Sequence, residues 1–105
     1  MTDKIVVLSA CDSEAQATTV ARALVERRVA ACVNILPGAR SIFRWKGKVE
    51  DAAEWLLVIK SRRDLFEALR AELQRVHSYE VPEVIALPVV EGSQGYLAWL
   101  DRELG

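Results

Sequence analysis

The sequence feature that most constrains the fold is the stretch Ala30–Ser61. β-Branched and aromatic residues recur on both sides of a Lys-Gly-Lys turn, which predicts one long β-hairpin that turns at Gly47. Each arm has roughly fourteen residues, which is long for a strand. Pro37-Gly38 interrupts the first arm. Because proline donates no backbone hydrogen bond, we expect a bulge or an exposed edge at that point.

Short strands and helices are predicted on either side of this hairpin. The apolar run Ile5–Leu8 predicts a buried strand, and Val84–Val90, which contains Pro88, predicts an edge strand. Apolar residues at helical spacing predict three helices. The first helix begins at Ser13, where Gln16 would complete a capping box, and it ends at Arg27-Arg28. The second helix has Ser61 as its N-cap and ends before His77–Pro82. The third helix follows Ser93.

The predicted order of these elements defines an α+β fold with a single domain, residues 1–105. Right-handed crossovers in a βαββαβ pattern give an antiparallel sheet of strand order 4-1-3-2, with the first two helices on one face. The C-terminal helix is an addition to this pattern.

Two features of this arrangement predict a homo-oligomer. The runs Ile5–Leu8, Trp55–Ile59 and Val84–Leu87 are apolar on both faces, yet at most the short last helix is left to cover the second face. The hairpin also extends beyond the outer strands by roughly six residues, on the order of 20 Å. A lone two-stranded ribbon is marginally stable in water, so we expect this arm to pack against another copy of the chain.

Composition and charge exclude several other classes of protein. The formal net charge is -1 and the sequence pI is about 5.8, so no basic field favours nucleic acid or an anionic membrane. No apolar run approaches the ~20 residues of a membrane helix. The N-terminal residues lack the features of a signal peptide, and the two cysteines fit reduced thiols. These observations predict a cytoplasmic location.

Three separated motifs and a closing segment resemble the CutA family of divalent-cation tolerance proteins. The motifs are AACVNILPG at Ala30–Gly38, SIFRWKGKVE at Ser41–Glu50 and HSYEVPEVIALPV at His77–Val89, and the segment is YLAWL at Tyr96–Leu100. The resemblance implies a ferredoxin-like subunit in a homotrimer, related in architecture to the PII signalling proteins. It implies binding of copper or another divalent metal, with a role in metal tolerance. We expect no metal to be required for folding.

The resemblance also implies metal ligands at Cys11 and His77. The family has a second histidine where this chain has Val76. The predicted topology independently places Cys11 and His77 at the end of the sheet from which the arm projects. Since a helix begins just after Cys11, its N-terminus is expected to favour the thiolate. A Cys-His pair suits Cu(I), or zinc if Asp12 or another subunit adds a ligand. The alternatives are a buried structural thiol and a histidine that caps a helix.

A second group of residues is predicted to form a cluster between subunits: Trp45, Lys60, Tyr79 and Glu83. Family members have the same residue types as the last three of these. Lys60 and Glu83 lie at opposite ends of the predicted sheet, so this group predicts a polar cluster, or a structural ion pair, between subunits. We expect Trp45 to pack across the same boundary. Cys32, on the hairpin's first arm, is expected in the core.

No motif predicts an enzyme. The chain lacks a Gly-rich phosphate loop, a nucleophile-base pair, the Cys-x-x-Cys of copper chaperones and the arginine-bearing loop of acylphosphatases. Two hypotheses follow: a metal-binding homotrimer, or a PII-like trimeric module that binds a small ligand or a protein at subunit clefts.

Overall fold

A computed structural model describes all 105 residues and confirms the α+β fold. The sheet order is β2-β3-β1-β4, which is the predicted order read from the other edge, and all its strand pairs are antiparallel. The elements in chain order are β1 (Lys4–Cys11), α1 (Glu14–Glu26), β2 (Cys32–Trp45), β3 (Lys48–Arg62), a short 3-10 helix η1 (Arg63–Leu65), α2 (Phe66–Val76), β4 (Ile85–Pro88) and α3 (Gln94–Glu103). No helix is both long and apolar enough to cross a membrane.

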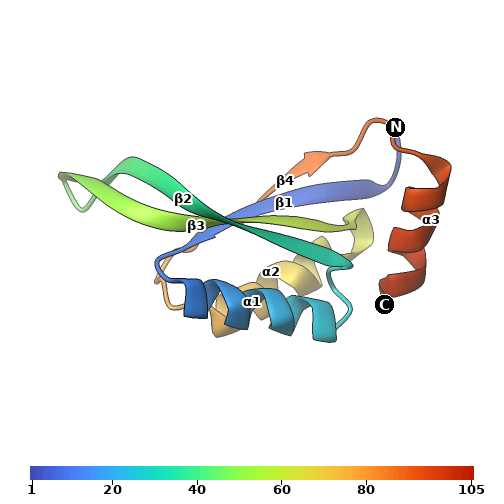
Figure 1. The fold of residues 1–105 in the computed structure, drawn as a ribbon, viewed down its shortest axis with the longest axis horizontal. Helices are drawn as coiled ribbons and strands as arrows, with labels where there is room; N and C mark the ends of the chain where they lie inside the picture. The colour runs from blue at the N-terminus through green and yellow to red at the C-terminus, as the bar shows by residue number, and fades with distance from the viewer.

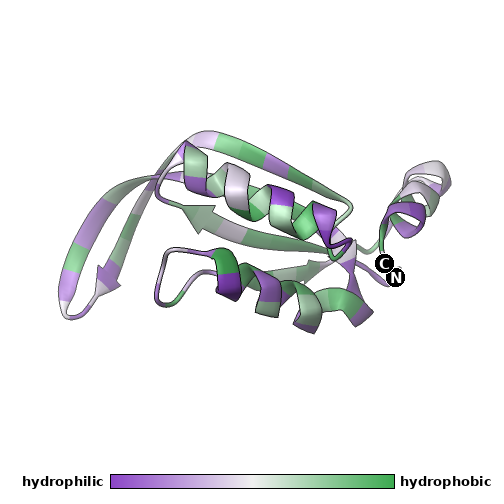
Figure 2. Cartoon of the chain, turned by 90° about the horizontal axis from the view of Figure 1, so that it is seen from below, coloured by the Kyte–Doolittle hydropathy of each residue, from purple (hydrophilic) through white to green (hydrophobic).

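Helices α1 and α2 lie side by side on one face of the sheet (Figures 1 and 2). The main core lies between them and this face. Its fully buried side chains come from alternate residues of β1 and β3 and from the inner sides of both helices: Val7, Cys11, Leu57, Ile59, Ala17, Val20, Leu24, Leu69 and Leu73. Every second residue of the strands and the residues on one side of each helix therefore face the same core, as the side-chain periods of strands (two) and helices (3.6) require.

Helix α3 covers an end of the sheet and leaves its second face open (Figure 1). Leu100 and Leu104 pack on Ala31 in a small separate cluster. Asp101 then pairs with both Lys4 and Arg62 at 3.2 Å. The last helix is therefore attached to the end of the sheet opposite the tip of the hairpin.

The start of α1 confirms half of the predicted capping box. The Ser13 hydroxyl accepts a hydrogen bond from the backbone N–H of Gln16 at 3.1 Å, as an N-cap should. The Gln16 side chain does not return to Ser13; its amide donates to the Val76 carbonyl at 2.8 Å. Gln16 therefore joins the start of α1 to the end of α2.

The predicted N-cap of the second helix is wrong. Ser61 lies inside β3, paired with Ile5, and is fully buried. Its hydroxyl donates to the Val29 carbonyl at 2.7 Å. Strand β3 continues to Arg62 because β1 pairs with it as far as Lys4, so α2 begins only at Phe66, without a side-chain cap.

Two irregularities in the hairpin are confirmed where the sequence predicts them. The β2–β3 register shifts between Leu36 and Ala39, at Pro37-Gly38, where Gly38 has φ +85°. The turn is formed by Lys46 (φ 49°) and Gly47 (φ 83°). Positive φ at both central residues is typical of the two-residue turn that matches strand twist.

The fourth strand, β4, lies at an edge of the sheet, as predicted, but it is shorter than expected. It spans Ile85–Pro88 instead of Val84–Val90 and pairs only with β1.

The predicted extension of the hairpin beyond the outer strands is confirmed. Pairing of β1 with β3 ends at Cys11 opposite Trp55, whereas β2 and β3 continue to pair from Ala39–Glu54 to Trp45–Lys48. Figure 1 shows the ribbon extending past all the other elements, and the molecule measures 44 × 25 × 23 Å. On the arm, Ile42 is 66% exposed and Val49 is 64% exposed. In this single chain nothing covers these apolar side chains.

The second face of the sheet is apolar and open, as the sequence predicts. Successive side chains of a strand point to opposite faces of the sheet. The even-numbered residues of β1 and β3 therefore lie on this face, next to every second residue of β2 and β4. Its apolar members are half-buried or exposed: Val6, Leu8, Leu36, Leu56, Val58, Ile85 and Leu87. A contiguous exposed apolar surface is typical of a contact site for another protein, a membrane or a ligand.

Replacing Ser61 with Ala should destabilise the fold. The change leaves the buried Val29 carbonyl without its side-chain donor, so we expect the free energy of unfolding to fall by about 1–3 kcal/mol. Urea denaturation at a fixed protein concentration measures the change. Ser41→Ala, on the arm, is the control and should stay within about 0.5 kcal/mol. Equal effects of the two substitutions would contradict a buried role for Ser61.

Candidate functional site

Cys11 and His77 meet at the base of the arm. Cys11 is the last residue of β1, and His77 follows the last turn of α2. The Cys11 Sγ and His77 Nε2 atoms lie 3.5 Å apart, and both side chains are buried. Both residues therefore lie at the same end of the sheet, as the sequence predicts. Whether they bind a metal remains a prediction.

Backbone groups occupy both ring nitrogens of His77. Nδ1 accepts a hydrogen bond from the backbone N–H of Tyr79 at 3.0 Å, so it carries no proton. The proton is on Nε2, which donates to the Ala10 carbonyl at 2.8 Å. His77 is thus a neutral imidazole that joins the end of α2 to the end of β1, and its ring does not cap a helix carbonyl.

The expectation of a Cys11 thiolate is wrong. Burial raises the pKa of the Cys11 thiol to about 11, and the negative charges of Asp12 and Glu54 act in the same direction. The side chain has no exposed surface. Loss of solvation and two nearby carboxylates outweigh the helix N-terminus, so Cys11 is a protonated thiol at neutral pH.

Glu54 is the residue of this site that sequence reasoning missed. It is buried, and its Oε2 accepts a hydrogen bond from the Tyr79 hydroxyl at 2.6 Å. Burial and this hydrogen bond raise the pKa of Tyr79. The Tyr79 ring also packs on the His77 ring, with centroids 4.7 Å apart. A carboxylate directly before the apolar run Trp55–Ile59 was the available signal, because a charge at such a position needs a partner.

The donor set resembles a site for a soft ion more than one for a hard ion. A thiol and an imidazole are together, and these groups suit Cu(I). No group of three His, Cys, Asp or Glu side chains in the chain is placed to hold a metal ion. Asp12 therefore does not complete a three-ligand site here, and a zinc site would need a ligand from another subunit.

The chain does not bring the second predicted group together. Tyr79 contacts Glu54, and Glu83 is an exposed residue before β4. Lys60 lies on the open face, where its ammonium contacts Asn34 Oδ1 and lies 3.8 Å from Cys32 Sγ. Cys32 is only partly buried and so lies outside the core that was expected to contain it.

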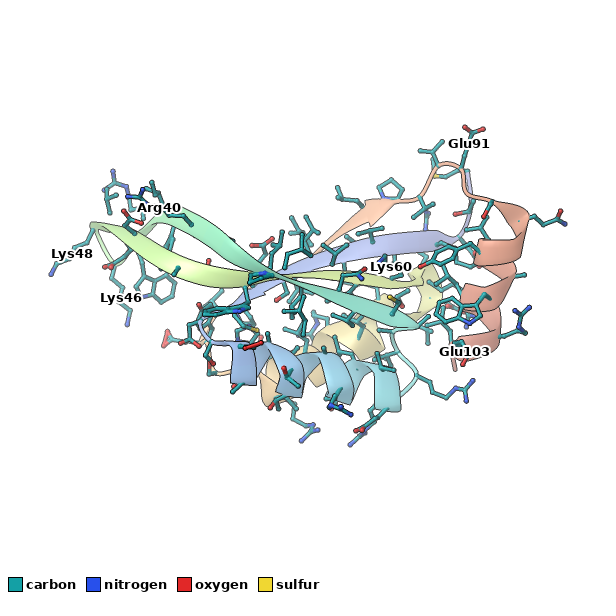
Figure 3. All side chains as sticks on the ribbon, viewed as in Figure 1. Arg40, Lys46, Lys48, Lys60, Glu91 and Glu103 are labelled. Carbon is teal, nitrogen blue, oxygen red and sulfur yellow. The ribbon has the colours of Figure 1, made fainter.

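The fourth member of that group, Trp45, lies near the tip of the arm and is 39% exposed. Figure 3 shows the neighbouring Lys46 and Lys48 at the same distant tip. The Lys46 ammonium lies 5.6 Å from the centre of the Trp45 ring. Contact among Trp45, Lys60, Tyr79 and Glu83 between subunits remains a prediction.

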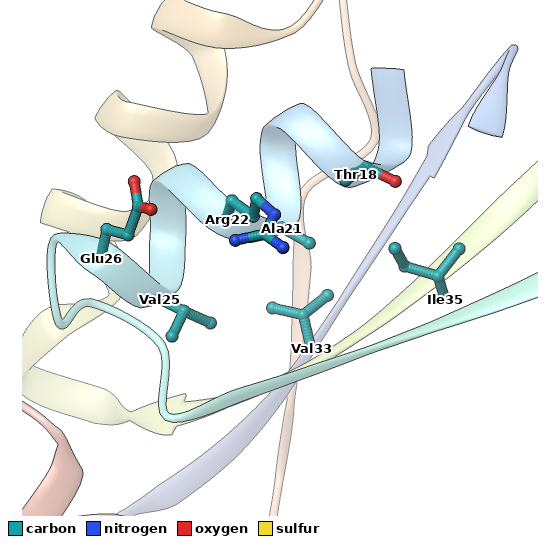
Figure 4. Close-up of a pocket in the computed structure, with 7 residues that line it drawn as sticks. All are labelled: Thr18, Ala21, Arg22, Val25, Glu26, Val33 and Ile35. Atoms are coloured by element: carbon teal, nitrogen blue, oxygen red, sulfur yellow. The ribbon is translucent and has the colours of Figure 1, made fainter. Parts of the chain in front are cut away.

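A shallow groove of about 320 Å³ between α1 and β2 is separate from this site (Figure 4). It has no cysteine or histidine in its lining, which consists of Thr18, Ala21, Arg22, Val25, Glu26, Val33 and Ile35. The groove has no evident connection to metal chemistry.

The two cysteines should differ sharply in reactivity. In protein diluted until the open face is uncovered, and at about pH 8.5, near the ordinary pKa of a thiol, iodoacetamide should modify the partly buried Cys32 first and leave Cys11 intact. Reaction at Cys11 should increase as the pH approaches about 11, because the thiolate is the nucleophile. Peptide mass spectrometry measures both rates, with the urea-unfolded chain as the control. Equal rates in the folded chain would show that Cys11 is not buried and protonated.

Comparisons with known proteins identify the family. Residues 5–103 match the family model for the CutA1 divalent ion tolerance protein. The chain is 48% identical over 100 residues to the divalent-cation tolerance protein CutA of Thermus thermophilus, covering 95% of this chain and 97% of that protein. It is 50% identical over 92 residues to protein CutA of Mus musculus, covering 88% of this chain but 52% of that longer protein.

Solved structures agree with this result. The Thermus thermophilus protein superimposes with a TM-score of 0.94 at 47% identity, covering 97% of this chain and 99% of that one. CutA from Xylella fastidiosa gives a TM-score of 0.96 at 38% identity, covering 99% and 100%. The chain therefore belongs to the CutA1 family of divalent-cation tolerance proteins.

Proposed function

We propose that this chain works in tolerance to divalent metal cations as a cytoplasmic homotrimer that binds copper through Cys11 and His77. The observation that carries the proposal is the 3.5 Å approach of Sγ to Nε2, which unites the only histidine of the chain with a thiol. The family supports the general role in tolerance.

The chemistry of the pair favours Cu(I) over a hard cation. A thiolate and an imidazole are soft donors, and two of them are enough for a low-coordinate soft ion. The carboxylates of Asp12 and Glu54 add negative charge near Cys11. This charge opposes ionisation of the free thiol but favours a bound cation.

The open face and the arm support the trimer. The apolar side chains of the second face lack a covering layer in one chain, and the arm has no packing partner. Other copies of the chain would cover both surfaces. In such an assembly Trp45 and Lys60 of one subunit would reach Tyr79 and Glu83 of another. The net charge of -1 favours neither nucleic acid nor a membrane as a partner.

A second candidate function is a PII-like module that binds a small ligand or a protein at subunit clefts. The hydrogen bonds at both His77 nitrogens favour it, because they give this residue a purely structural role. In that case metal binding would be incidental.

A Cu(I) competition titration separates the two candidates. Cys11→Ala and His77→Ala should each weaken Cu(I) binding by more than about tenfold, because each removes one donor of a two-donor site. Cys32→Ala is the matched control, since it removes the other thiol, and its affinity should equal that of the original chain. If Cys11→Ala and His77→Ala leave the affinity unchanged, the metal site is refuted and the second candidate is favoured.

Light scattering tests the assembly. The purified chain should have a mass three times its 11.7 kDa, because a trimer covers the arm and the open face. The change Leu56→Glu, on the open face, should lower that mass by burying a charge in the interface. A well-folded monomer of the unaltered chain would contradict the trimer.

A further inference from the structure

The nitrogen of His77 that faces Cys11 carries a proton. Nε2 lies 3.5 Å from Sγ and donates its N–H to the Ala10 carbonyl. An N–H group has no lone pair in the ring plane for a metal ion. In this arrangement, His77 therefore cannot act as a ligand on the side where Cys11 lies.

The position of the proton is fixed from the other side of the ring. For Nε2 to bind an ion, a neutral imidazole must carry its proton on Nδ1. Nδ1 lies 3.0 Å from the backbone nitrogen of Tyr79, which already directs its own N–H at Nδ1. Two hydrogens would then point at each other, so the Tyr79 backbone must move before Nε2 is free.

Two further contacts hold Tyr79 in place. Its hydroxyl donates to the buried Glu54 carboxylate at 2.6 Å, which is short and charge-assisted. Its ring packs on the imidazole, with centroids 4.7 Å apart. Glu54 is the first β3 residue beyond the end of β1, where it pairs with Ala39 at the base of the arm. A continuous set of contacts thus runs from the arm through Tyr79 to His77.

We propose that Tyr79, anchored by Glu54, is a positioning residue that holds His77 in the tautomer that cannot bind metal. The role in metal binding rests on the proposed function above. Binding of a soft ion at Cys11 and His77 then requires release of Tyr79, and this release loosens the attachment of the loop after α2 to the base of the arm. Because release of Tyr79 and ion binding are linked equilibria, any contact that strengthens the Glu54–Tyr79 hydrogen bond lowers the affinity for the ion by the same factor.

The first test needs no metal. ¹⁵N NMR of the His77 ring distinguishes the two neutral tautomers, and the unaltered chain should carry its proton on Nε2. Tyr79→Phe keeps the ring but removes the hydroxyl that reaches Glu54, so the fraction with the proton on Nδ1 should rise. Tyr96→Phe is the matched control, since that tyrosine lies on α3 and packs on Trp99. A proton on Nδ1 in the unaltered chain, or no change in Tyr79→Phe, overturns the proposal.

The second test is Cu(I) affinity by competition titration. Tyr79→Phe should bind Cu(I) up to about tenfold more tightly, the factor expected for one lost hydrogen bond that opposes binding, and Tyr96→Phe should be unchanged. Equal affinity of Tyr79→Phe and the unaltered chain overturns the proposal even though copper binds. If the unaltered chain binds no Cu(I), the proposed function fails, and the NMR result alone decides whether Tyr79 positions His77.

Discussion

The end of pairing between β1 and β3, at Cys11 opposite Trp55, is the constraint on which the rest of the structure depends. Strand β1 has eight residues, while β2 has fourteen and β3 has fifteen, so the sheet narrows to a two-stranded arm at that point. The same point places Cys11 beside His77, which directly follows α2. The donor pair and the base of the arm therefore share one location because strand lengths differ.

Charge and solvation at this location explain why the pair is neutral. Cys11 is fully buried and lies near two carboxylates, so its thiol keeps its proton. His77 uses both nitrogens to join backbone groups of two segments that are far apart in the sequence. In the free chain this pair stabilises the junction of β1 and α2. A ligand that binds there must compete with these hydrogen bonds, which couples the site to the local fold.

Most of the fold could be predicted from sequence, because hydrophobic periodicity and turn residues report local structure directly. Ser61 resembles an N-cap in the sequence because it precedes charged residues, whereas pairing with the distant β1 extends the strand through it. The state of Cys11 could not be predicted, since its pKa depends on burial and on Glu54, which is distant in sequence. Glu54 itself escaped notice because its partner, Tyr79, is brought near only by the folded chain.

The proposed assembly requires other copies of the chain to cover the arm and the open face. Hydrogen–deuterium exchange of the peptide that spans residues 39–54 tests this claim directly, because an uncovered two-stranded ribbon opens readily in water. In the trimer, arm amides should exchange nearly as slowly as those of β1, and they should lose this protection when the protein is diluted until it dissociates. Rapid exchange of the arm in a concentrated sample, with β1 still protected, would show that no other copy of the chain covers the arm.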